Sequence, residues 1–126
     1  MATIKSFTLL EQSKKLAEIL PPESADMWYS YYGNSKYNPT IAYRGQQWFL
    51  CQIRNSLHDD IPCWSLAALL SILPNGTNVI KDESDTETEH YMCTVGIKDD
   101  ITSTFSDNPV DACVAMIEKL NELKLL

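Results

Sequence analysis

The sequence predicts an α+β fold: one domain over residues 1–126, with a mostly antiparallel sheet of five to six short strands and three helices. Segments of alternating, β-branched and aromatic residues stand beside three segments of helical character. The links between them are short, without the strand–helix–strand rhythm of a parallel sheet. A chain of 126 residues has the size of one domain with one core.

The central helix is predicted from the longest nearly uninterrupted apolar run of the chain, residues 61–74. Pro62 suits the first helical turn, where a missing N–H removes no hydrogen bond, and Pro74 suits the end. Only Ser65 and Ser71 interrupt the run, so apolar side chains point in every direction. Such a helix must be surrounded by protein, which makes this segment the expected core.

The N-terminal helix is expected directly after Thr8, because Thr8 and Glu11 have the spacing of a capping box. Pro21 and Pro22 would end it. Helical periodicity predicts an apolar face that consists of Leu9, Leu16, Ala17 and Leu20.

The segment from Met27 to Arg54 is rich in aromatic and β-branched residues and is interrupted by turn residues. We expect three strands here, at residues 27–32, 40–44 and 47–53, with one bent strand or a tight hairpin over the last two as the alternative. A polar loop at residues 55–60 would lead into the central helix.

The second half of the chain predicts a three-stranded meander followed by a helix. The expected strands are residues 79–81, 90–97 and 102–105, and the acidic run between the first two is expected to be a solvated loop. The C-terminal helix should begin with Asn108 as its cap and Pro109 in its first turn. It would then run to the C-terminus and lie across the meander.

The charge of the chain restricts its partners. With 17 acidic and 10 basic residues, the net charge is −7. Nucleic-acid binding depends on lysine and arginine that neutralise phosphates, so a nucleic-acid partner is not expected, and anionic lipid surfaces are disfavoured for the same reason. We therefore expect the chain to bind another protein or to form a homo-oligomer.

No membrane span or secretory signal is predicted, because the apolar run 61–74 is shorter than the about 20 residues that cross a bilayer and the first residues lack a basic and apolar leader. We therefore expect a cytoplasmic protein. The four cysteines have no C-x-x-C spacing and are interpreted as buried, reduced side chains. Without ligand spacing or a glycine-rich phosphate loop, neither a metal nor a cofactor is expected.

The sharpest catalytic candidate is Cys63, which the predicted helix would place at its N-terminus, where the pKa of a thiol is lowered. Papain-like hydrolases place their nucleophile there with a tryptophan after it, as Trp64 follows here, and His58 or His90 could act as the base. The residues that precede and follow that motif in papain-like enzymes are missing. The preferred interpretation is therefore no catalytic residue, with Cys63 packed in the core.

The richest binding candidate is the aromatic cluster between residues 28 and 49. Alternation places Tyr29 and Tyr31 on the strand face opposite Trp28, so that one face can enter the core and the other can contact a partner. The predicted binding residues are Tyr29, Tyr31, Tyr43 and Trp48. The alternative is that these aromatic residues pair with one another across strands.

Three motifs resemble those of a group of small uncharacterised proteins from gut bacteria, often carried on prophages or other mobile elements. They are Leu-Pro-x-Glu-Ser-Ala-Asp-Met at 20–27, Ile-Pro-Cys-Trp-Ser-Leu-Ala-Ala-Leu-Leu at 61–70 and Asp-Asn-Pro-Val-Asp-Ala-Cys-Val-Ala-Met-Ile at 107–117. This resemblance implies a genomic setting and no catalytic residue. Residues 90–120 also resemble the β-β-α end of HicB-type antitoxins, which implies an arrangement and not a function.

The leading hypothesis is a non-enzymatic, cytosolic protein-binding accessory factor of a mobile element. One alternative is a small thiol hydrolase that uses Cys63 with His58 or His90. The other is an acidic DNA-mimic inhibitor, which requires its acidic residues to gather on one surface. The members of that set are Asp82, Asp85, Glu87, Glu89, Asp99 and Asp100.

Overall fold

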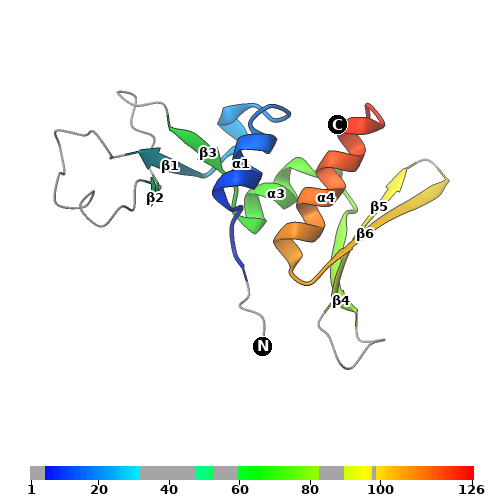
Figure 1. The fold of residues 1–126 in the computed structure, drawn as a ribbon. Helices are drawn as coiled ribbons and strands as arrows, with labels where there is room; N and C mark the ends of the chain where they lie inside the picture. Colours follow the sequence, from blue (N-terminus) through cyan, green and yellow to red (C-terminus); the bar gives the residue numbers. More distant parts are fainter. Residues whose placement is uncertain (1–4, 32–47, 53–59, 83–89, 98) are drawn as a thin grey trace. The chain divides into compact units, whose positions relative to one another are not determined.

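The structure, a computed structural model, describes residues 5–31, 48–52, 60–82, 90–97 and 99–126. It confirms the α+β class (Figure 1). The described residues form three α-helices and six strands, and the strands make two antiparallel sheets of three rather than one sheet. The chain forms two compact units, which we call the aromatic unit, Leu9–Trp64, and the meander unit, Met1–Thr8 with Ser65–Leu126. That the chain is one domain stays a prediction.

The aromatic unit contains a helix, a short 3-10 helix and one sheet. Its sheet has the order β2-β1-β3, and β1 pairs antiparallel with both neighbours. The strand predicted at residues 40–44 lies outside the described residues. The elements of this unit are α1 (Leu10–Leu16), the 3-10 helix η1 (Pro22–Ser24), β1 (Met27–Tyr31), β2 (Trp48–Cys51) and β3 (Ile61–Cys63).

Helix α1 begins one residue later than predicted, because Leu9 and not Thr8 occupies the cap position. The side chain that bonds to the backbone of the cap residue is Gln12 and not Glu11: the Gln12 Oε1 accepts a hydrogen bond from the Leu9 N–H at 3.0 Å. Thr8 is fully buried. Of the predicted apolar face, Leu16 and Leu20 are buried, whereas Leu9 and Ala17 are exposed.

The expectation that residues 61–63 begin the central helix is wrong. They form β3, which pairs with Met27–Tyr29 of β1 at an edge of the sheet, a position that tolerates proline because its N–H is not needed there. The helix α3 (Leu66–Ile72) begins only after Ser65, whose Oγ accepts a hydrogen bond from the Ala68 N–H at 3.2 Å. Pro62 therefore belongs to a strand and not to a helical turn.

The central helix exists, but protein does not surround it on every side. Ala68 and Leu69 are buried, whereas Ala67, Leu70 and Ser71 are exposed. The continuous apolar run thus forms an amphipathic helix. The sequence pattern alone could not distinguish this helix from a fully buried helix.

The meander unit confirms the prediction for the second half of the chain. Strands β4 (Asn78–Asp82), β5 (His90–Ile97) and β6 (Asp100–Ser106) form a meander in this order, and α4 (Pro109–Glu122) packs against all three (Figure 1). Strand β6 is longer than predicted, since it pairs with β5 from Ile97↔Asp100 to Tyr91↔Ser106 without interruption. Pairing, rather than local propensity, sets its length.

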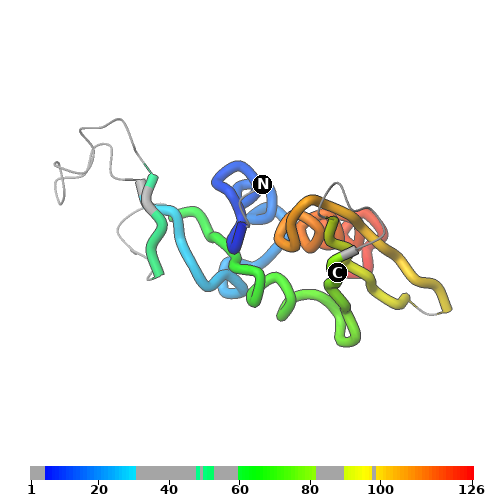
Figure 2. Tube along the Cα trace, turned by 90° about the horizontal axis from the view of Figure 1, so that it is seen from below, coloured from blue at the N-terminus to red at the C-terminus, as the bar shows by residue number. Residues whose placement is uncertain are grey.

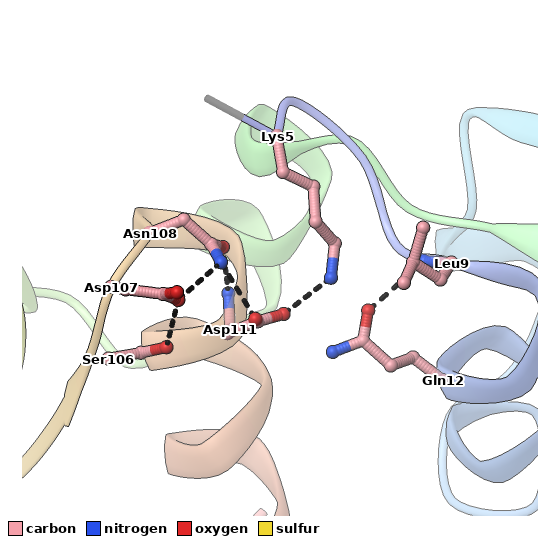
Figure 3. A network of polar contacts seen from close by, with 7 residues as sticks. All are labelled: Lys5, Leu9, Gln12, Ser106, Asp107, Asn108 and Asp111. Atoms are coloured by element: carbon pink, nitrogen blue, oxygen red, sulfur yellow. Dashed lines mark hydrogen bonds and ion pairs between the residues drawn. The ribbon is translucent and has the colours of Figure 1, made fainter. Parts of the chain in front are cut away.

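The start of α4 is fixed by polar contacts that Figure 3 shows from close by. Asn108 caps the helix as predicted, because its Oδ1 accepts a hydrogen bond from the Asp111 N–H at 2.8 Å. Lys5 forms an ion pair with the Asp111 carboxylate. The segment that carries Lys5 runs beside the start of α3, where Phe7 forms a β-bridge with Ser65 (Figure 2).

Candidate functional site

One face of the β4-β5-β6 sheet packs against α4, and β5 shows which face this is. Cys93 and Val95 are buried, and Thr104, which pairs with Cys93, donates its hydroxyl hydrogen bond to the Ala112 carbonyl oxygen of α4 at 2.6 Å. Because side chains alternate between the two faces of a strand, the neighbouring residues point away from α4.

The opposite face, which we call the outer face, carries four large apolar side chains: Ile80, Met92, Ile101 and Phe105. Ile80, Met92 and Phe105 lie directly opposite one another in the registers of the three strands, so they form one row across the sheet. Ile80 is 50% exposed, Phe105 58% and Ile101 75%.

Ile101 is the most exposed of these residues for a simple reason. Its partner in β5 is Gly96, which has no side chain to cover it. Between this pair and the apolar row lie Thr94 and Ser103, whose hydroxyl oxygens are 3.3 Å apart. The outer face therefore presents apolar groups at two places, with a small polar pair between them.

Acidic side chains stand at both ends of β6. Asp99 and Asp100 are exposed where β6 begins, and Asp107 is exposed where it ends. The Asp107 carboxylate accepts hydrogen bonds from Ser106 Oγ at 3.3 Å and from Asn108 Nδ2 at 3.0 Å (Figure 3). Both donors are neutral, so they orient this carboxylate without cancelling its charge.

Such a face can bind another surface. Exposed aliphatic and aromatic groups gain free energy when a partner removes them from water, by about 25 cal/mol per Å². Contiguous apolar patches of this kind on a folded protein commonly mark interaction sites.

The predicted binding residues lie in the aromatic unit. Trp48 is half-buried, with Lys14 Nζ 5.9 Å from the centre of its ring. Tyr29 is half-buried on β1, Tyr31 is the last residue of that strand, and Tyr43 lies outside the described residues. Register places Tyr29 on the strand face that also carries Trp48. Their role in binding stays a prediction.

The Tyr29 hydroxyl is engaged inside the unit. Burial first, and then the charge and the hydrogen bond of Cys63, raise the pKa of Tyr29 from 10.0 to about 12. The Tyr29 hydroxyl therefore has a hydrogen-bond partner, Cys63, inside the aromatic unit.

The structural premise of the thiol hydrolase is wrong. Cys63 is fully buried in β3 and stands before the Ser65 cap, so it does not occupy a helix N-terminus. Of the two candidate bases, His90 is half-buried at the start of β5, and His58 lies outside the described residues.

The remaining cysteines fit the interpretation as core residues. Cys93 and Cys113 are fully buried and their thiols share a hydrogen bond, while Cys51 is half-buried. This hydrogen bond, followed by burial, raises the pKa of Cys113 well above its ordinary value, and it lowers the pKa of Cys93.

Of the acidic set of the DNA-mimic hypothesis, Asp82, Asp99 and Asp100 lie within the described residues, and whether the set gathers on one surface stays a prediction. Asp82 pairs with His90 at one end of β5, whereas Asp100 pairs with Ile97 at the other end. Seven residues of extended strand separate these ends by about 23 Å. The other members of that set in the run 83–89 lie outside the described residues.

Within the described ranges, no three histidine, cysteine, aspartate or glutamate side chains come together as a metal site. In the same part of the chain, no helix combines the length and apolarity that crossing a bilayer requires.

The outer-face residues were missed by sequence reasoning. Ile101 and Phe105 share one parity of a largely polar strand, a signal that two apolar positions would face the same way. Only the register with β5 shows that Ile101 and Phe105 lie on the sheet face opposite to Cys93 and Val95, and therefore away from α4.

Comparisons of the chain with protein-family models, with curated proteins and with solved structures found no match.

Proposed function

We propose that the protein is a non-enzymatic binding module that attaches to another protein through the outer face of the β4-β5-β6 sheet. The observation that carries this proposal is the exposure of Ile80, Ile101 and Phe105 on the face that α4 leaves uncovered. Apolar side chains that are exposed to water can be buried by a partner. The apolar side chains on the other face of the sheet are already covered by α4.

The net charge of −7 favours a different protein over a second copy as the partner. Two copies repel each other when each carries the same excess of acidic residues, whereas a basic protein is attracted. The resemblance to proteins of mobile elements supports a role as an accessory factor in a bacterial cytoplasm.

The test is affinity capture with tagged full-length protein from cells that carry its native genetic element. The protein captured at a stoichiometric ratio is then purified and mixed with the pure chain to reconstitute the complex. The same experiment is run with the double variant Ile80→Thr and Phe105→Thr, which removes apolar surface but keeps β-branched residues in the strands.

The matched control is the double variant Leu125→Thr and Leu126→Thr, which changes two exposed leucines that follow the end of α4. We expect the control to bind like the wild type and the outer-face variant to lose at least about tenfold in affinity. Equal binding by all three proteins would contradict the proposal.

A further inference from the structure

We propose that the partner docks by strand addition: an extended, basic peptide segment pairs with the free edge of β6 and extends the sheet by one strand. This inference rests on the proposed function and specifies the chemistry that the partner must present.

The edge of β6 is open and regular. All seven of its residues pair with β5 in a continuous register, and no other strand of the described chain pairs with it on the far side. An edge strand directs alternate N–H and C=O groups outward, where another chain can pair with them. An incoming peptide can therefore form the same main-chain hydrogen bonds that join β6 to β5.

The edge also lacks the features that normally prevent such pairing. Proteins protect their edges with short strands, lysine, proline or bulges. Strand β4, at the other edge of the sheet, is shorter and contains Lys81, whereas β6 contains no lysine, arginine or proline from Asp100 to Ser106. Of the two edges, β6 is therefore the one that accepts a partner.

The side chains beside this edge define what the peptide carries. Ile101 and Phe105 are 75% and 58% exposed, and both point to the outer face. A strand added next to β6 would place alternate side chains against them, at the distance of ordinary cross-strand pairs. Apolar residues at alternate positions of the peptide would cover both.

The charges at the two ends of β6 identify the peptide as basic. Asp99 and Asp100 mark one end and Asp107 the other, and none of the three forms an ion pair among the described residues. Seven residues of strand place Asp100 and Asp107 about 23 Å apart. Lysine or arginine at both ends of the peptide would meet these carboxylates.

A second copy of this chain fits the edge less well. If two β6 strands paired antiparallel about Ser103, Asp99 of each copy would lie opposite Asp107 of the other. Like charges directly opposite one another oppose pairing, and the net charge of −7 adds to this repulsion.

The probe for the test is a nine-residue peptide in which alternating valine and threonine are flanked by one lysine at each end. It is titrated into the full-length protein while amide hydrogen exchange is followed residue by residue by NMR. We expect saturable binding, with exchange slowed at least about tenfold at alternate amides of β6 only, since those N–H groups point outward.

Three matched probes sharpen the result. Two carry N-methyl groups on alternate backbone nitrogens in the two possible phases, and we expect only one phase to bind, because only one leaves the pairing donors intact. The third has glutamate in place of lysine and should not bind.

In the protein, Asp107→Asn should weaken binding of the lysine peptide by about two- to fivefold. The control Glu122→Gln, which changes an exposed carboxylate on α4, should leave this binding unchanged.

Several outcomes would overturn strand addition. The peptide fails to bind at millimolar concentration, or it binds without the alternating protection of β6, or the free protein is a dimer whose β6 amides are already protected. The proposed function is judged separately with the captured partner. If that partner depends on Ile80 and Phe105 but leaves exchange in β6 unchanged, the binding face is correct and strand addition is wrong.

Discussion

The two sheets of this chain differ in where their apolar side chains go. The strands of the β2-β1-β3 sheet hold five of the twelve aromatic residues of the chain, yet every side chain described in these strands is buried or half-buried. The strands of the β4-β5-β6 sheet hold only two aromatic residues, Tyr91 and Phe105, yet this sheet leaves Ile80, Ile101 and Phe105 exposed on one face.

Coverage by other elements, and not aromatic content, therefore decides which apolar side chains stay exposed. The buried side chains of Trp28 and Trp64 contribute large apolar areas to the interior of the aromatic unit. Within the same unit, Tyr29 is hydrogen-bonded to Cys63. In the meander unit one helix covers one face of the sheet, and the few apolar residues on the opposite face stay exposed. The following predictions test this contrast between an internal aromatic sheet and an external apolar face.

The largest effect is expected in the aromatic unit. Trp64 is fully buried and its Nε1 donates a hydrogen bond to Ser24 Oγ at 2.9 Å. Trp64→Ala removes this bond and leaves a cavity, so we expect the free energy of unfolding to fall by about 3–5 kcal/mol. Urea unfolding followed by far-UV circular dichroism measures the change. A loss below about 1 kcal/mol would show that Trp64 is not an internal anchor.

The alkaline stability of the protein should depend on Tyr29. Its pKa is raised from 10.0 to about 12 in the folded chain, so the unfolded chain releases this proton first as the pH rises. The stabilisation is complete below pH 10 and is lost between pH 10 and 12.

Urea unfolding at a series of alkaline pH values therefore should show a decline that Tyr29→Phe reduces. Ultraviolet absorbance of the tyrosinate gives a direct control for the pKa itself. A wild-type and a variant curve of equal slope through this range would refute the internal role of the Tyr29 hydroxyl.

A smaller effect is expected at the start of α4. Asn108→Ala removes the side-chain acceptor of the helix cap and should lower the free energy of unfolding by about 1 kcal/mol. Asn108→Ser keeps a capping oxygen and should recover most of that loss. Thermal unfolding by circular dichroism compares the two variants. If they were equally unstable, the cap would not be the cause.

The smallest effect on stability is expected on the outer face. Ile101→Thr and Phe105→Thr change exposed side chains that fill no interior space, so each should alter the free energy of unfolding by less than about 0.5 kcal/mol. Urea unfolding of both variants measures this. A destabilisation as large as that of a core substitution would mean that the outer face is covered in the folded chain.

The meander unit was predictable because its local signals agree with its tertiary structure. Asn108, Pro109 and Asp111 define the start of α4, and the alternation of residues 90–97 defines β5 with the bounds observed. Residues 61–63 were not predictable in the same way. Proline at the first turn of a helix and proline in an edge strand look alike in sequence, and only pairing with β1 decides between them.

The candidate site could be predicted only in part. Sequence reasoning favoured tyrosine and tryptophan, because these residues concentrate binding free energy at interfaces. It could not see that Gly96 leaves Ile101 uncovered, or that the register places Met92 and Phe105 on the face without a helix. Those facts depend on pairing between residues far apart in the chain.

One binding assay compares the two sheets directly as contact surfaces. The captured and purified partner is titrated by calorimetry with wild-type protein, with the double variant Ile80→Thr and Phe105→Thr, and with Trp48→Leu. We expect the outer-face variant to weaken binding at least about tenfold and Trp48→Leu to change it less than about twofold. The reverse order would place the contact on the aromatic sheet and contradict this account.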